Sequence, residues 1–158
     1  MIYIQGAQYA YYSYDADGMG FWGGVDANGF QVIHPDEIVT MPYPFSVGDV
    51  HQDSLSFVFD AAGDLVHRDI HLTSVAVEWG SLLLPGELAF NDVMRVETEQ
   101  LIYDSTATMD ASLLLVTTAF WAQDMPLPVA QNYTYSEVAG GDTSVLVVGS
   151  EFMLETMM

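Results

Sequence analysis

The stretch SFVFDAAGDLVH, residues 56–67, decides the fold class of this chain. Two short runs of mainly apolar residues flank the tetrapeptide Asp60-Ala61-Ala62-Gly63. The aspartate can accept hydrogen bonds from nearby backbone amides, and the glycine tolerates the positive φ that closes a tight hairpin. The same Asp-x-x-Gly form recurs at residues 15–18 and 26–29. The chain is therefore expected to reverse direction at short intervals, as antiparallel sheets do.

Alternating side chains extend this β pattern through the rest of the sequence. Residues 73–79 alternate cleanly between two faces, and residues 95–103 do so less cleanly. Residues 111–121 and 144–149 are apolar on both faces. Such runs predict strands that are covered on both sides, by a second sheet or by a neighbouring subunit. About nine or ten strands are expected in all.

Helical patterns are short and scarce. Residues 85–93 and 136–139 could each hold one turn, but neither carries the apolar stripe of an amphipathic helix. Polar connections near residues 35–53, 104–110 and 123–132 predict surface loops. The length suits one domain over residues 1–158. The predicted fold is all-β: an antiparallel β-sandwich, jelly-roll-like, with little helix.

Acidic residues dominate the charge. The chain has 22 Asp and Glu against two basic residues, Arg68 and Arg95, and its net charge is -20. Self-repulsion of this size opposes compaction in dilute buffer, whereas molar salt shortens the Debye length to about 3 Å. We interpret the composition as a halophilic surface. A genome that disfavours lysine codons, or a surface that binds divalent cations, would give the same excess.

The charge also limits the partners and the location. A chain this acidic gains nothing from counterion release, so direct contact with nucleic acid or an anionic membrane is not expected. The first residues lack the basic and apolar regions of a signal peptide, and the apolar stretch 113–122 is about half the length of a membrane span. Without cysteine there is no disulfide framework and no thiolate site. An intracellular product, or one released by lysis, is expected.

One cluster has the residue types of a transition-metal site. His67, Asp69 and His71 are spaced two apart, so a β-strand would project them from one side, about 7 Å apart per step. Two imidazoles and a carboxylate suit a transition metal, but a straight strand holds them too far apart for one ion without further ligands, for which Glu78 or His51 are candidates. A solvated polar strand face is the alternative.

Two of the turns have oxygen ligands at the spacing of a calcium loop. Asp15 and Asp17 precede one glycine, and Asp26 and Asn28 precede another. Alternating oxygens of this kind wrap hard cations, although neither turn continues into an EF-hand. Ordinary tight hairpin turns would use the same residues. Calcium or other cations at subunit contacts are therefore the cofactors considered, and otherwise none is expected.

No motif for catalysis is present. The sequence contains no Gly-x-Ser-x-Gly nucleophile elbow, and acidic pairs such as Glu97 and Glu99 arise by chance among so many carboxylates. The chain is therefore not expected to be an enzyme.

Aromatic residues and both chain ends point to protein contacts instead. Tyrosine and tryptophan are enriched at interfaces, although packing within the monomer or sugar stacking would also use them. Arg68 and Arg95 are expected to pair with carboxylates, one of them in a buried position, and Arg95 is expected to do so at a contact. The apolar C-terminal run is expected to dock on a neighbour or to close the core. The predicted interface residues are Tyr9, Tyr11, Tyr12, Phe21, Trp22, Arg95, Phe152 and Leu154.

These features favour a structural virion protein. The first hypothesis is a small capsid subunit or an outward-facing capsid decoration protein. It would form homo-oligomers and contact other capsid proteins at high salt. It would be made in the host cytoplasm and located in the virion. The alternative is a β-sandwich module that binds carbohydrate or protein, with calcium as a stabilising ion. A metal-dependent enzyme using His67, Asp69 and His71 is the third hypothesis.

Overall fold

Ten strands and no helix make up the part of the chain that the computed structural model describes, which is residues 2–5, 8–26, 28–123, 125, 127–140 and 142–152. The all-β prediction is confirmed for these residues. None of them lies in a helix long and apolar enough to cross a membrane. The strands are β1 (Ile2–Gln5), β2 (Gln8–Tyr14), β3 (Gly18–Val25), β4 (Gln31–Pro42), β5 (Val50–Ala61), β6 (Asp64–Leu84), β7 (Leu88–Ser105), β8 (Asp110–Ala122), β9 (Ala130–Ala139) and β10 (Asp142–Phe152).

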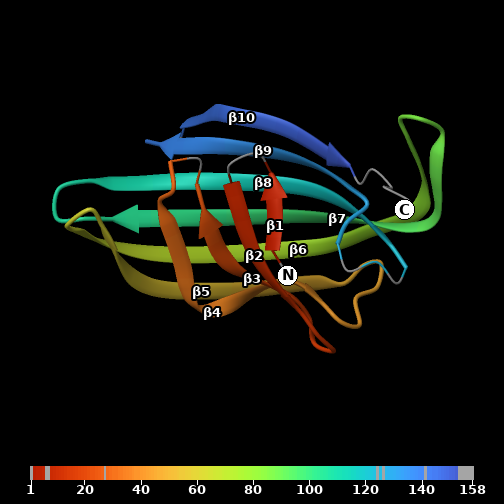
Figure 1. Cartoon of the computed structure of the whole chain (residues 1–158), viewed down its shortest axis with the longest axis horizontal. Helices are drawn as coiled ribbons and strands as arrows, with labels where there is room; N and C mark the ends of the chain where they lie inside the picture. Colours follow the sequence, from red (N-terminus) through yellow and green to blue (C-terminus); the bar gives the residue numbers. More distant parts are fainter. Residues whose placement is uncertain are drawn as a thin grey trace.

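The strands form two antiparallel sheets, and each sheet is a simple meander. Strands β1 to β4 make a four-stranded sheet, and strands β5 to β10 make a six-stranded sheet, each in sequence order. Figure 1 shows the smaller sheet lying across one face of the larger one. A jelly roll requires Greek-key connections between non-consecutive strands. The jelly-roll part of the prediction is not confirmed, because every described pairing joins neighbours in sequence.

The Asp-x-x-Gly turns close hairpins as predicted. The amide of Gly63 donates to Asp60 Oδ1 at 2.8 Å, and Ala62 and Gly63 both adopt positive φ. The strands that this turn connects pair Val58 with His67 and Phe59 with Val66. The side-chain oxygen and the glycine therefore act together, as the local sequence requires.

Two apolar clusters join the sheets. In the first cluster, Met19 and Met41 of the small sheet pack on Val96 and Trp121 of the large one. In the second, the fully buried Ile38 packs against residues that include Phe57, Ile70 and Leu72. Between the clusters, the buried Ser74 hydroxyl donates to the carbonyl of Thr40 at 2.9 Å and lies 3.0 Å from Thr98 Oγ1. The sheets are thus held by apolar contacts and by a small polar bridge.

Several segments differ from the local predictions. Residues 85–93, considered for a helical turn, form the tip of the β6–β7 hairpin and the start of β7, and residues 136–139 belong to β9. The predicted loop over residues 35–53 contains the second half of β4 and the start of β5. In each place, pairing with a neighbouring strand satisfies the backbone, which a weak local helix or loop signal does not anticipate.

Residues 80–92 extend beyond the body of the sheet as a two-stranded arm. Strand β8 pairs with β7 only as far as Val93, whereas β6 and β7 remain paired as far as Leu84 and Leu88. Figure 1 shows this hairpin curving away from the sheet. The side chain of Leu83 on it is 72% exposed.

Candidate functional site

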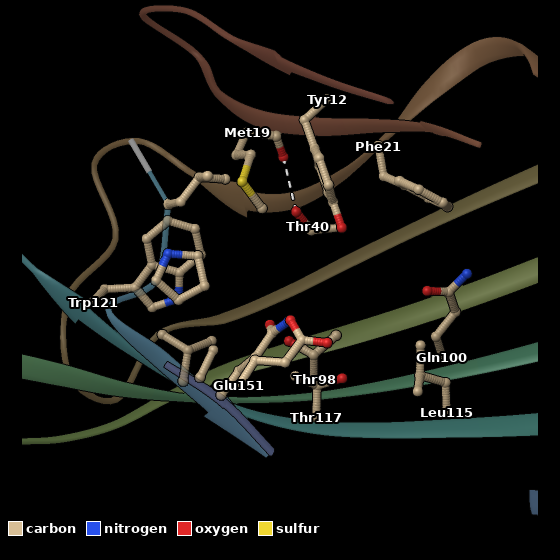
Figure 2. A pocket seen from close by; sticks show the side chains of 15 residues that line it. Tyr12, Met19, Phe21, Thr40, Thr98, Gln100, Leu115, Thr117, Trp121 and Glu151 are labelled. Carbon is tan, nitrogen blue, oxygen red and sulfur yellow. Dashed lines mark hydrogen bonds between the residues drawn. The ribbon is translucent and has the colours of Figure 1, made fainter. Parts of the chain in front are cut away.

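A cavity of about 230 Å³ lies between the two sheets (Figure 2). Its roof comes from the small sheet, with Tyr12 on β2, Met19 and Phe21 on β3, and Thr40 on β4. Its floor comes from β7 and β8, and the segment before β9 closes one side. The floor and side residues are Val96, Thr98, Gln100, Leu115, Thr117, Ala119, Trp121, Leu127 and Pro128, with Gln131 and Glu151 from β9 and β10.

The pairing of β7 with β8 creates a polar strip in the middle of an apolar floor. Thr98 lies opposite Thr117, and Gln100 lies opposite Leu115. Alternation then directs all four side chains toward the small sheet. The two apolar clusters flank this strip, so the sheets meet closely on either side and leave a space between them.

Gln100 contributes a side-chain amide to this cavity. Its side chain is only 7% exposed, and among the described residues its amide has no hydrogen-bond partner. Figure 2 shows the amide pointing away from β7 toward the small sheet. The amide atoms are not among the fully enclosed atoms that lack a partner, so they face the open space of the cavity. The amide is therefore a donor and an acceptor directed into the cavity.

Tyr12 and Glu151 provide further polar groups. Burial, assisted by the nearby Glu151 carboxylate, raises the pKa of the Tyr12 hydroxyl to about 12. This hydroxyl is therefore protonated at neutral pH. Gln131 Nε2 donates to Glu151 Oε2 at 2.9 Å, which orients the carboxylate at the β9–β10 side of the cavity.

The arrangement is suited to binding a small molecule. Apolar and aromatic walls with a few converging polar groups are typical of small-molecule pockets. Within the described lining, Glu151 is the one charged residue, and none is a histidine.

The predicted transition-metal residues do not line this cavity. His67, Asp69 and His71 share the outer face of β6, where Nδ1 of His67 is 3.6 Å from Oδ2 of Asp69. Asp69 also accepts a hydrogen bond from the Ser56 hydroxyl. No group of three potential metal ligands occurs among the described side chains. Binding of a transition metal remains an untested prediction.

The calcium candidates act as turn residues. Asp15 Oδ1 accepts from the amide of Asp17 at 2.9 Å, and Asp26 Oδ1 accepts from the amides of Asn28 and Phe30 at 2.8 Å. These bonds use one carboxylate oxygen of each aspartate within the turn itself. Calcium binding at the two turns likewise remains a prediction.

The predicted interface residues divide between the interior and the surface. Tyr12 and Phe21 pack on one another inside the molecule, with ring centroids 5.3 Å apart, so these two line the cavity. Tyr9 is 41% exposed, and Tyr11 and Trp22 are half-buried. Two other candidates fall outside the description: the side chain of Phe152, at the end of β10, and the whole of Leu154.

The two arginines have different settings. Arg95 lies on the outer face of the large sheet, where its Nε is 3.2 Å from Glu78 Oε1 without hydrogen-bond geometry and its Nη2 is 3.6 Å from Glu97 Oε1. Arg68 lies on the inner face and forms a two-point pair with Asp104, at 2.7 and 2.6 Å. Arg68 is thus the more buried cation; the sequence predicted that both arginines pair with carboxylates, without showing which one is buried.

Searches of protein-family models, of curated proteins and of solved structures found no match to this chain. Its function must therefore be inferred from its own residues.

The sequence places the polar residues of the cavity floor on one face of their strand, but alternation does not show which face is covered. Thr98 and Gln100 share one face of their strand with Val96, and Arg95, Glu97 and Glu99 share the other. Both faces are partly polar, so the pattern did not show which one the small sheet covers.

Proposed function

We propose that the protein is a self-assembling structural component of a virion that works at high salt, either a small capsid subunit or an outward-facing decoration protein. The observation that carries the proposal is the edge strand β10. Four consecutive apolar residues there, Val145 to Val148, are each at least 50% exposed. A long apolar edge strand invites pairing with another chain.

The composition of β10 supports an intermolecular partner. Residues 144–149 were expected to be covered by a second sheet or by a subunit, and the small sheet packs over the inner face without covering these side chains. This exposure is compatible with the second of the two predicted coverings, a neighbouring subunit. Burying apolar side chains contributes about 25 cal/mol per Å² of area removed from water.

The β6–β7 arm supports the same function. A two-stranded ribbon is marginally stable alone in water. The exposed Leu83 near its tip and the 55% exposed Trp79 at its base would gain from burial against another subunit. Beside the base lies a hollow of about 300 Å³, lined by aromatic and methionine side chains that include Tyr43, Phe45 and Met94.

The charge of the chain favours salt and disfavours nucleic acid. With a net charge of -20, subunits repel one another unless salt screens them. The proposed partners are further copies of this chain and other capsid proteins. Direct contact with the genome and insertion into a membrane are not part of the proposal. The proposed location is the virion, after synthesis in the host cytoplasm.

Val148→Glu is expected to weaken self-association by about tenfold, because it places a charge where apolar burial is needed. Val148 is the most exposed of the four residues, at 71%. The measurement is light-scattering mass after size exclusion, in NaCl from about 0.1 to 3 M, where wild type should assemble only at the upper end.

Leu65→Glu is the matched control for this substitution. Leu65 is 67% exposed but lies on β6, next to the β5–β6 turn, and its change adds the same charge. It should assemble like wild type. A monomer at all salt concentrations, or equal loss in both variants, would contradict the role of β10.

A ligand-binding module is the second candidate, and the inter-sheet cavity is the observation that favours it. For a calcium-stabilised module, the melting temperature should rise with calcium and not with an equal ionic strength of sodium. A salt-indifferent monomer with that response would favour this candidate over the virion.

A further inference from the structure

We propose that the cavity between the sheets binds a small aromatic molecule whose hydrogen-bonding head is uncharged or cationic, and that it rejects anions. This goes beyond assembly, and it does not depend on assembly.

The volume sets the size of the ligand. A dry engineered cavity of about 150 Å³ takes up benzene. The present cavity, at about 230 Å³, has room for one ring with a short side chain. Phe21 and Trp121 supply aromatic walls on opposite sheets, and Met19 adds a soft apolar contact.

The buried amide of Gln100 defines the need for a polar head. Its carbonyl can accept and its NH₂ group can donate, and no described residue satisfies either. Thr117 adds a hydroxyl to the same floor, also without a hydrogen-bond partner in the described part of the chain. A ligand head that bonds to these groups would compensate them when the ligand displaces solvent from the cavity, which purely apolar ligands cannot do.

The charges around the cavity exclude an anionic head. Glu151 contributes a carboxylate to the lining, and the Tyr12 hydroxyl is a neutral donor. Neither arginine is in the lining: Arg68 is paired with Asp104 outside it, and Arg95 lies on the opposite face of the sheet. An anion would therefore be desolvated beside a like charge, whereas an ammonium head and the aromatic walls would attract one another.

Methionine methyl NMR tests the site directly. Full-length protein labelled with ¹³C at the methionine methyl groups would be titrated with 2-phenylethanol, 2-phenylethylamine and phenylacetate, three probes of similar shape. The signal of Met19 should shift with the first two, with dissociation constants on the order of 1 mM. Met109, which is 66% exposed in a loop, should not shift. Phenylacetate should bind at least about tenfold more weakly.

Neighbouring threonines provide a matched pair of variants. Thr117→Val removes the hydroxyl from the cavity, and Thr118→Val makes the same change on the outer face of β8. Thr117→Val and Gln100→Leu should each weaken the binding of 2-phenylethanol by about five- to tenfold. Thr118→Val should leave this binding unchanged. The remaining methyl signals report whether each variant is folded.

Two results would overturn the proposal. One is a Met19 signal unmoved by both 2-phenylethanol and 2-phenylethylamine at about 10 mM, well above the expected dissociation constants. The other is phenylacetate binding as tightly as the uncharged probe. Because the readout is a local shift, its failure is distinguishable from failure of assembly, which light scattering reports separately.

Discussion

Arg68→Ala is expected to lower the free energy of unfolding by about 3–5 kcal/mol. The guanidinium makes two hydrogen bonds to Asp104, and the two side chains are only 18% and 20% exposed. It also lies 4.9 Å from the centre of the Phe59 ring. Removing it leaves a half-buried carboxylate without a cation in a chain of net charge -20, so the charge imbalance increases. Urea unfolding at constant molar NaCl measures the change.

The other arginine is the control for this substitution. Arg95→Ala removes the same positive charge from the outer face, where its partner Glu78 is 61% exposed. Its cost should stay below about 1 kcal/mol, as for surface ion pairs. The double variant Arg68→Met, Asp104→Leu should recover most of the lost stability, because neither charge is left unpaired. Equal losses of unfolding free energy in Arg68→Ala and Arg95→Ala would show that the loss of a positive charge, and not the breaking of the buried pair, destabilises the protein.

Acidification is expected to destabilise the protein through His34. This residue is 5% exposed, and its ring lies 5.2 Å from that of Phe21 and 5.1 Å from that of Phe57. Burial, aided by the charge of Arg68 and opposed by a hydrogen bond to the backbone of Phe21, lowers the pKa of His34 from 6.5 to about 4. The folded state therefore holds the neutral imidazole, while the unfolded state takes up a proton.

The contribution of His34 to stability depends on pH between about 6.5 and 4. Because the unfolded state binds more protons below pH 6.5, the stability from His34 is fully present above that pH and declines as the pH falls toward 4. The loss should reach about 3 kcal/mol. Urea unfolding as a function of pH measures it, in molar NaCl to screen the carboxylates.

His34→Leu isolates this contribution. The variant keeps an apolar side chain between the two phenylalanines and has no group that titrates there. Its stability should fall less steeply than that of wild type between pH 6.5 and 4, and the carboxylates, common to both proteins, cancel in the comparison. Parallel curves would mean that His34 takes up its proton as readily in the folded state as in the unfolded state.

Local sequence was enough to predict the turns and the strand class. Asp60 and Gly63 act on their own backbone, and Val58 and Phe59 pair with residues a few positions away. Such interactions depend on short-range hydrogen bonds and allowed φ, which the residue types set directly. The helical turn considered at residues 136–139 was wrong because pairing with β8 and β10 outweighs weak local preference.

The candidate site required the tertiary structure. The polar strip of Thr98, Gln100 and Thr117 looks like any half-polar strand face in the sequence, and only the small sheet above it turns it into a cavity floor. The same covering moves Tyr12 and Phe21 inside. The charge, the lack of cysteine and the Asp-x-x-Gly turns could be read residue by residue. Contacts between residues far apart in the chain decide which face is covered, which arginine is buried and which edge stays open. Alternation defines the two faces of a strand, but it does not say which face another sheet will cover.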